Sequence, residues 1–158
     1  MHTVDGSNRP RGLKFAVVVS RYHDFVTEKL KAGAVAALAA AGIADEAVTL
    51  VHVPGAFELP IAARHAAETG EFAAIVCLGC LIRGATPHFE YIASAVAHGL
   101  TSAAADTGVP VTFGVLTTNS VEEALERAAS GPSNKGWEAA TAAVDMAGVV
   151  AALVERVE

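Results

Sequence analysis

The chain has 158 residues, of which 53% are hydrophobic and 18% are charged, and 14 of them are glycines. This length and composition predict one globular domain with a sizeable core, and they exclude a disordered or repetitive chain. The formal net charge of −6 excludes general binding to nucleic acids or to anionic membranes, so a phosphate ligand would need local cations.

The N-terminal residues and the hydropathy of the chain indicate where in the cell the protein is found. No stretch approaches the apolar length that spans a bilayer, and residues 1–6 lack the apolar core of a secretory signal, so we expect a cytoplasmic protein. Residues 1–12 are rich in glycine, proline, asparagine and arginine. They predict a flexible arm, or an edge strand on a neighbouring subunit, ahead of one domain over residues 13–158.

Strand-like and helix-like segments alternate along this domain. The strands are predicted at 14–20, 47–53, 73–78 and 111–117, and the helices at 24–41, 58–68, 87–105, 121–128 and 136–156. The third strand is an uninterrupted apolar run, which is typical of a strand buried on both faces of a parallel sheet. The order predicts an α/β fold, a single-domain three-layer αβα sandwich around a mainly parallel four-stranded sheet.

Ligands of such sheets bind beyond the carboxyl ends of the strands, so the four loops that follow the strands form one candidate site. These loops hold an unusual mixture of aromatic, acidic and basic residues. They cover residues 21–25, 54–58, 79–91 and 117–120.

The loop at 79–91 has the features of a phosphate site. Thr86 is a good N-cap and Pro87 suits the first helical position, so a helix is expected to begin at Pro87. Its free amides and dipole favour an anion, with Arg83 nearby as a mobile cation. The same dipole favours a neutral His88 ring that can accept a proton. The alternative is that Thr86 only caps the helix and His88 only packs.

Cys77 and Cys80 form a C-x-x-C pattern within the third strand. Three residues apart on an extended strand, they point to opposite faces, unlike redox motifs at helix starts. Two small buried side chains are therefore favoured over a metal or redox site.

Four ordered motifs resemble the lumazine synthase family over a range from about residue 13 to the last helix. They are Pro54-Gly55-Ala56-Phe57-Glu58, Ile82-Arg83-Gly84-Ala85-Thr86-Pro87-His88-Phe89, Gly114-Val115-Leu116-Thr117-Thr118 and Asn134-Lys135-Gly136. The resemblance implies a flavodoxin-like fold. It also implies condensation of 5-amino-6-(D-ribitylamino)uracil with 3,4-dihydroxy-2-butanone 4-phosphate to 6,7-dimethyl-8-ribityllumazine, the penultimate step of riboflavin biosynthesis, without a metal or an organic cofactor.

The resemblance also implies roles for the residues that handle protons and phosphate. His88 matches the residue that transfers protons, and Thr86 with the amide of Ala85 matches the phosphate cradle. Arg127 matches the arginine that binds phosphate, for which a guanidinium is well suited. Without the resemblance, Arg127 would be interpreted as a solvated helix residue.

A second set matches the residues that hold the ribitylaminopyrimidine. Tyr22 matches the ring that stacks on the pyrimidine, while Phe57, Glu58 and the backbone of Ala56 match the residues around the ribityl chain. Taken alone, Tyr22 would be a half-buried loop residue, and Glu58 would only complement a helix dipole. His23 stands where the family often has asparagine.

Further matches extend the implied site. The stretch Cys80, Leu81 and Ile82 matches main chain that binds the pyrimidine, so the identity of Cys80 should matter little. Lys135 matches a basic residue near the pyrimidine, although an ordinary surface lysine is the alternative. Phe113 matches a residue contributed by the adjacent subunit, which implies a site shared between subunits.

The resemblance implies self-association and a functional link to riboflavin synthase, with no nucleic-acid or membrane partner. Members form pentamers, and some stack twelve of these into an icosahedral capsid. The stretch 127–136 has no insertion, which favours the capsid, although Pro132 departs from the usual turn. A flavodoxin-like module that only binds a flavin or lumazine, and a shell protein without catalysis, are the alternatives. His88 beside a phosphate cradle argues against both.

Overall fold

The computed structural model describes residues 1–156 and contains a four-stranded sheet. The strands are β1 (Phe15–Ser20), β2 (Val48–Val53), β3 (Ala74–Ile82) and β4 (Val111–Thr118). They are hydrogen-bonded in the order β2-β1-β3-β4, and every pair is parallel. The predicted doubly wound parallel sheet is therefore confirmed.

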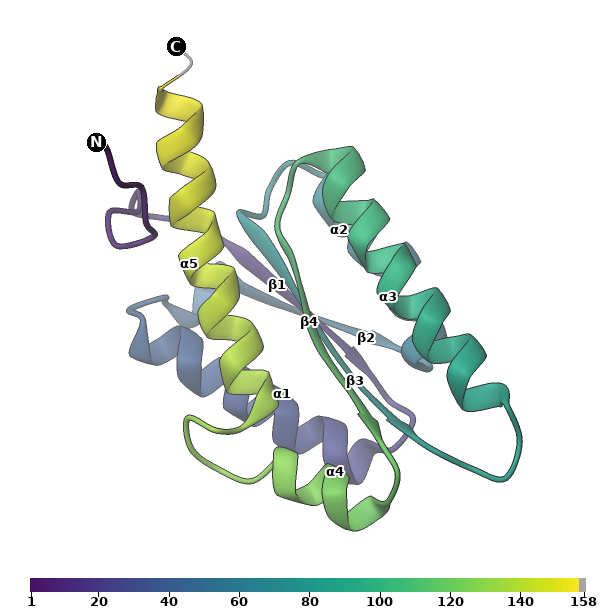
Figure 1. Cartoon of the computed structure of the whole chain (residues 1–158). Coiled ribbons are helices and arrows are strands. Elements are labelled where there is room, and N and C mark those ends of the chain that lie inside the picture. The colour runs from purple at the N-terminus through teal and green to yellow at the C-terminus, as the bar shows by residue number, and fades with distance from the viewer. Residues whose placement is uncertain (157–158) are drawn as a thin grey trace.

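Helices cover both faces of this sheet (Figure 1). Helices α1 (Asp24–Ala40) and α5 (Lys135–Glu155) pack on one face, and α2 (Leu59–Glu68) and α3 (His88–Thr107) pack on the other. The short helix α4 (Val121–Arg127) lies beside the end of β4. The predicted three-layer αβα sandwich is confirmed.

The central strands are buried on both faces because their side chains alternate between two cores. On β1, Phe15 and Val17 join the core under α1 and α5, whereas Ala16 and Val18 join the core under α2 and α3. All four are fully buried. Complete burial of a large apolar side chain contributes about 1.5–3 kcal/mol, so the uninterrupted apolar runs stabilise both layers at once.

Cys77 and Cys80 show the same alternation. Cys77 belongs to the core beneath α2 and α3, and Cys80 belongs to the opposite core. Both are buried free thiols. The prediction that they face opposite sides of the sheet as small buried side chains is confirmed.

Several boundaries differ from those predicted. Strand β3 continues to Ile82 because it pairs with β4 along its whole length, up to the pair Ile82 and Thr118. Helix α2 begins at Leu59 because a 3-10 turn, η2 (Ala56–Glu58), precedes it. A second turn, η1 (Asp45–Ala47), was not predicted.

Helix α5 corrects one sequence-based expectation. It is long and apolar enough, by length and composition, to cross a membrane, so the expectation that no stretch approaches this length was wrong. Its buried residues, which include Ala140, Ala143 and Ala147, pack in the core shared with α1 and the sheet. Packing in this core accounts for part of the apolar surface of α5.

Residues 1–12 lie outside the sheet of this single chain and contain neither helix nor strand. The arm contacts α5, since a Cβ built on Gly148 would lie 2.6 Å from the carbonyl oxygen of Gly6. Arg9 Nη2 also donates to the carbonyl oxygen of Ala41 at 2.7 Å. The flexible arm, the edge strand on a neighbour and the domain over 13–158 remain predictions, and residues 157–158 lie outside the described part.

Candidate active site

A cavity of about 510 Å³ lies at the carboxyl edge of the sheet, where ligands of doubly wound folds bind. It is lined by residues from the loops after β1 and β2, from β3, and from the start of α3. Seven predicted site residues are among them: Tyr22, Ala56, Cys80, Leu81, Ile82, Thr86 and His88. The fold therefore brings together loops that are far apart in the sequence.

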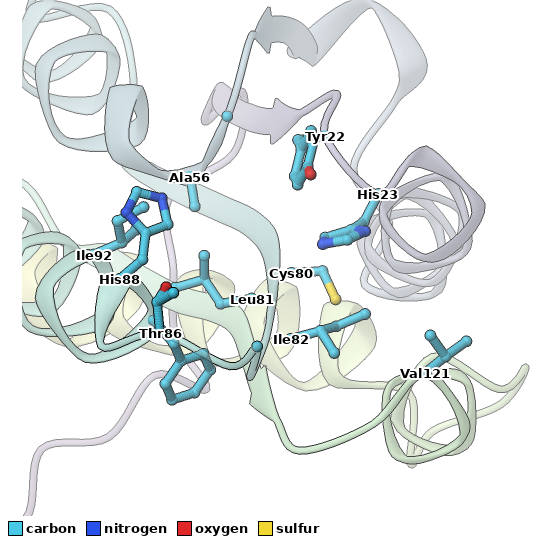
Figure 2. A pocket seen from close by; sticks show the side chains of 13 residues that line it. Tyr22, His23, Ala56, Cys80, Leu81, Ile82, Thr86, His88, Ile92 and Val121 are labelled. Carbon is cyan, nitrogen blue, oxygen red and sulfur yellow. The ribbon is translucent and has the colours of Figure 1, made fainter.

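The two functional groups of this cavity lie on opposite sides of it. Figure 2 shows Tyr22 and His23 on one side and Thr86 and His88 on the other, with Leu81 and Cys80 between them. Tyr22 is 69% exposed although its amide donates to the carbonyl oxygen of Pro54 at 3.0 Å. The backbone holds the ring at the rim while leaving its face free for a ligand.

His23 lines the cavity and was not among the predicted site residues. Its ring lies 4.4 Å from the Tyr22 ring, centroid to centroid, and 5.7 Å from that of Phe25. Burial of the imidazole lowers its pKa. Its backbone is left-handed, with φ 61° and ψ 48°, at the N-cap of α1. Asparagine and histidine both tolerate this conformation, which accounts for either residue at the position.

The loop between β3 and α3 carries Thr86 and His88, and it begins differently from the prediction. Helix α3 starts at His88 with Pro87 at the N-cap, and among the described residues no side chain caps this end. The predicted N-cap role of Thr86 is wrong because Thr86 lies two residues before the first helical residue. Its side chain faces the cavity instead.

Arg83 is not the mobile cation that we expected. Its Nε donates to Asn119 Oδ1 at 3.0 Å, its Nη1 is paired with the Glu90 carboxylate, and its guanidinium carbon lies 4.6 Å above the centre of the Phe89 ring. The hydrogen bond from Arg83 lowers the pKa of Glu90. Arg83 is thus engaged by three neighbours rather than free to meet a ligand.

Three predicted residues border this cavity without lining it. Phe57 and Glu58 belong to the turn η2 directly after Ala56, which does line it. Phe57 is 62% exposed. Ala85 lies between Gly84 and Thr86, which both line the cavity, so its amide is close to the same space.

The last three predicted residues meet elsewhere. Phe113, Arg127 and Lys135 line a separate hollow of about 350 Å³ beside the edge strand β4. Arg127 Nη1 donates to the carbonyl oxygen of Glu123 at 3.2 Å, and Lys135 Nζ is paired with Glu138 at 2.9 Å. Within one chain, the structure does not bring these residues to the cavity that holds His88.

Sequence reasoning also missed other lining residues. Besides His23, the cavity is lined by Gly55, Gly84, Phe89, Ile92 and Val121. Gly55, Gly84 and Phe89 stand within the motifs quoted above, so their proximity could have been inferred. Val121 opens α4 and is 40% exposed, and nothing in its local sequence signals a ligand.

The fold and the site define a class. A doubly wound parallel sheet with an aromatic ring and a histidine facing one cavity at its carboxyl edge is typical of an α/β enzyme that acts on small molecules. The model of the 6,7-dimethyl-8-ribityllumazine synthase family matches residues 12–151. A 6,7-dimethyl-8-ribityllumazine synthase of Syntrophus aciditrophicus (strain SB) is 48% identical over 136 residues, which cover 86% of this chain and 88% of the relative.

The chain therefore belongs to the 6,7-dimethyl-8-ribityllumazine synthase family. Membership makes it an enzyme of the transferase class in riboflavin biosynthesis, and it confirms the predicted family and the flavodoxin-like fold class. The apolar helix α5 accordingly contributes its buried residues to the core of this enzyme.

Proposed function

We propose that this enzyme condenses 5-amino-6-(D-ribitylamino)uracil with 3,4-dihydroxy-2-butanone 4-phosphate to form 6,7-dimethyl-8-ribityllumazine. The amine attacks the ketone, phosphate and water leave, and the ring closes. The observation that carries the proposal is the convergence of Tyr22, Thr86 and His88 on one cavity. A flat ring, an anion site at a helix start and a base are what this chemistry requires.

The pyrimidine substrate would occupy the side of the cavity near Tyr22. Its ring would stack on Tyr22, and the main chain of residues 80–82 would bind its polar edge. The ribityl chain would extend toward Phe57 and Glu58, where the Glu58 carboxylate can accept hydrogen bonds from hydroxyl groups. The exposed position of both aromatic side chains supports this arrangement, because each has a free face.

The phosphorylated ketone would occupy the opposite side. Its phosphate would lie against Thr86 and the amide of Ala85, near the positive end of the α3 dipole. His88 follows directly and would take up and return protons during attack and ring closure. Two oriented substrates then react as if within one molecule, which is a large part of the expected acceleration.

A complete site would need a second subunit. Phe113, Arg127 and Lys135 line their own hollow at the sheet edge, which suits a surface that meets the cavity of a neighbouring copy. A head-to-tail contact of this kind forms a closed ring when the rotation between neighbouring subunits closes. We propose a pentamer in the cytoplasm, with stacking into a capsid favoured by the short stretch 127–136, and delivery of the product to riboflavin synthase.

Formation of the lumazine chromophore tests the proposal. Purified protein is mixed with both substrates, and absorbance is followed beside a control without enzyme, because the amine and the ketone also react unaided. Formation well above that background is the expected result. Background formation together with retained binding of a lumazine or flavin would instead indicate a binding or shell protein.

A further inference from the structure

Arg83 connects three parts of the chain at the end of β3. Its backbone amide donates to the carbonyl oxygen of Thr118 at 2.8 Å, and its Nε donates to the side chain of Asn119, just after β4. Its Nη1 reaches Glu90 in the first turn of α3, and its face covers the Phe89 ring. One planar side chain thus contacts the end of β4 and the start of α3.

The pair of Arg83 and Glu90 spans the loop that carries the proposed catalytic groups. Residues 84–87 lie between the two, and all four are exposed. A Cβ built on Gly84 would meet nothing within 4 Å. The loop therefore has little packing of its own, and the ion pair joins its two ends around Thr86 and His88.

A contribution to folding stability does not explain why Arg83 and Glu90 are paired across this loop. Arg83 and Glu90 are about half exposed, with side-chain exposures of 48% and 52%. Exposed ion pairs contribute little to folding. Their geometry can still fix an orientation, because a guanidinium offers several donors in a rigid fork together with a flat face, which a lysine lacks.

We propose that Arg83 is a positioning residue that holds the loop at 84–87, and with it His88, in the geometry needed for proton transfer. This inference rests on the proposed function of His88. Arg83 acts through Glu90 and Asn119 and does not touch substrate. It should therefore support turnover and, through Ala85 and Thr86 in the same loop, use of the phosphorylated ketone, whereas the residues proposed to bind the pyrimidine remain in place.

The test compares Arg83→Gln, Arg83→Lys and Glu90→Gln with a matched control, Arg64→Gln. Arg64 also bonds two carboxylates, Glu68 at 3.0 Å and Asp106 at 2.9 Å, but it joins α2 to α3 away from the cavity. Lumazine formation is measured with each substrate varied in turn. Arg83→Gln and Glu90→Gln should lower kcat by about tenfold to about 10²-fold, the cost of a small misplacement, with the KM for the pyrimidine unchanged. Arg64→Gln should match wild type.

One further variant, compared with Arg83→Lys, separates positioning from a local packing defect. The charge swap Arg83→Glu with Glu90→Arg should recover part of kcat because it rebuilds the pair across the loop, whereas Arg83→Lys should recover little. Full activity of Arg83→Gln would overturn the proposal. So would a raised KM for the phosphorylated ketone at an unchanged kcat, which would make Arg83 a direct phosphate ligand.

Amide hydrogen exchange gives a readout that does not depend on activity. Loss of the pair in Arg83→Gln should speed exchange by about tenfold or more at the amides of Arg83, Glu90 and Tyr91, which donate to the carbonyl oxygens of Thr118 and Pro87, with little change in the core strands. Unchanged exchange at these three amides would overturn the positioning role. If the wild-type protein formed lumazine only at the background rate, the proposed function itself would be wrong. Failure of the positioning role and failure of the proposed function are therefore distinguishable.

Discussion

His88 and Arg127 line different hollows of the same chain. His88 faces the cavity at the carboxyl edge of the sheet, whereas Arg127 lies with Phe113 and Lys135 beside the edge strand β4. If the two residues act on one substrate, as we propose, they must come from two subunits. The side chain of Phe113 is 49% exposed in the single chain, and we expect a neighbouring subunit to cover it.

A mixing experiment tests this shared site. His88→Ala and Arg127→Ala should each form lumazine poorly alone. When the two variants are unfolded together and refolded at equal amounts, some sites receive His88 from one subunit and Arg127 from the other. Random assembly in a closed ring should restore about a quarter of wild-type activity. Refolded single variants are the controls, and absence of any recovery in assembled mixtures would contradict a shared site.

Arg127→Ala should act mainly on the phosphorylated ketone. Loss of a charged hydrogen-bond donor to phosphate removes about 1.5–3 kcal/mol, which corresponds to a rise in KM of about tenfold to about 10²-fold for that substrate. The KM for the pyrimidine should change little. Kinetics with each substrate varied in turn measure both values, and Arg64→Ala is a surface control. Equal weakening for both substrates would make Arg127 structural.

The sheet could be predicted almost completely from the sequence because its signal is local. Apolar runs at β1 and β3 mark buried parallel strands, and glycines mark helix ends, as at Gly42 with φ 82°. The continuation of β3 to Ile82 was missed, since it depends on pairing with β4, which lies about thirty residues further along the chain.

The candidate site was predictable only in part, for two physical reasons. The first is conformation: the left-handed backbone of His23 and the late start of α3 follow from tertiary packing, and no short motif encodes them. The second is geometry across the sheet. Sequence order cannot show that Phe113 on the edge strand and Arg127 beside it line one hollow, while His88 lies beyond the strand ends.

Cys80→Ala should leave lumazine formation largely intact, although Cys80 lines the cavity. Burial raises the pKa of this thiol to about 11, so it stays protonated at neutral pH and is a poor nucleophile. The variant should lose only about 1 kcal/mol of stability from reduced apolar burial. Initial rates measure the first effect and urea unfolding the second. Cys77→Ala, outside the cavity, is the control, and complete loss of activity in Cys80→Ala alone would give Cys80 a chemical role.

His23 should make stability depend on pH. Burial lowers its pKa below the ordinary value of 6.5, so the unfolded chain binds a proton at a higher pH than the folded chain does. The free energy of unfolding should therefore fall as the pH drops from 6.5 through the folded pKa, and this part of the dependence should level off below it. Asparagine tolerates the same left-handed backbone, so His23→Asn should flatten the pH dependence of the free energy of unfolding between about pH 7 and about pH 5.

The control for this prediction separates the loss of the titrating imidazole from strain in the left-handed backbone at position 23. His23→Ala also removes the titrating ring, but alanine at φ 61° is strained by about 1–2 kcal/mol, so it should be less stable than His23→Asn at every pH. Urea unfolding at several pH values measures both variants. An unchanged pH dependence in His23→Asn would show that another group is responsible.

Asn134 joins the two helices that frame the hollow of Arg127 and Lys135. Its side-chain oxygen accepts from the amides of Gly136 at 2.8 Å and Trp137 at 3.1 Å, which caps α5. Its amide nitrogen donates to the carbonyl oxygens of Lys29 on α1 and Ala128 after α4, at 3.2 and 2.9 Å. Asn134 is 1% exposed, so removal of its side chain would leave the amides of Gly136 and Trp137 and the carbonyl oxygen of Ala128 without this partner, whereas the Lys29 carbonyl lies within α1.

Asn134→Ala should therefore lower the free energy of unfolding by about 3 kcal/mol, because it removes a cap and leaves the buried carbonyl oxygen of Ala128 without this partner. The matched control is Ser120→Ala at the cap of α4, where one bond to the amide of Glu123 at 3.1 Å is lost and the cost should be about 1 kcal/mol. Urea unfolding measures both. Equal costs would show that the contacts to α1 and α4 contribute nothing. The larger cost would show that the contacts from Asn134 to α1 and to the end of α4 stabilise the fold beyond the cap itself.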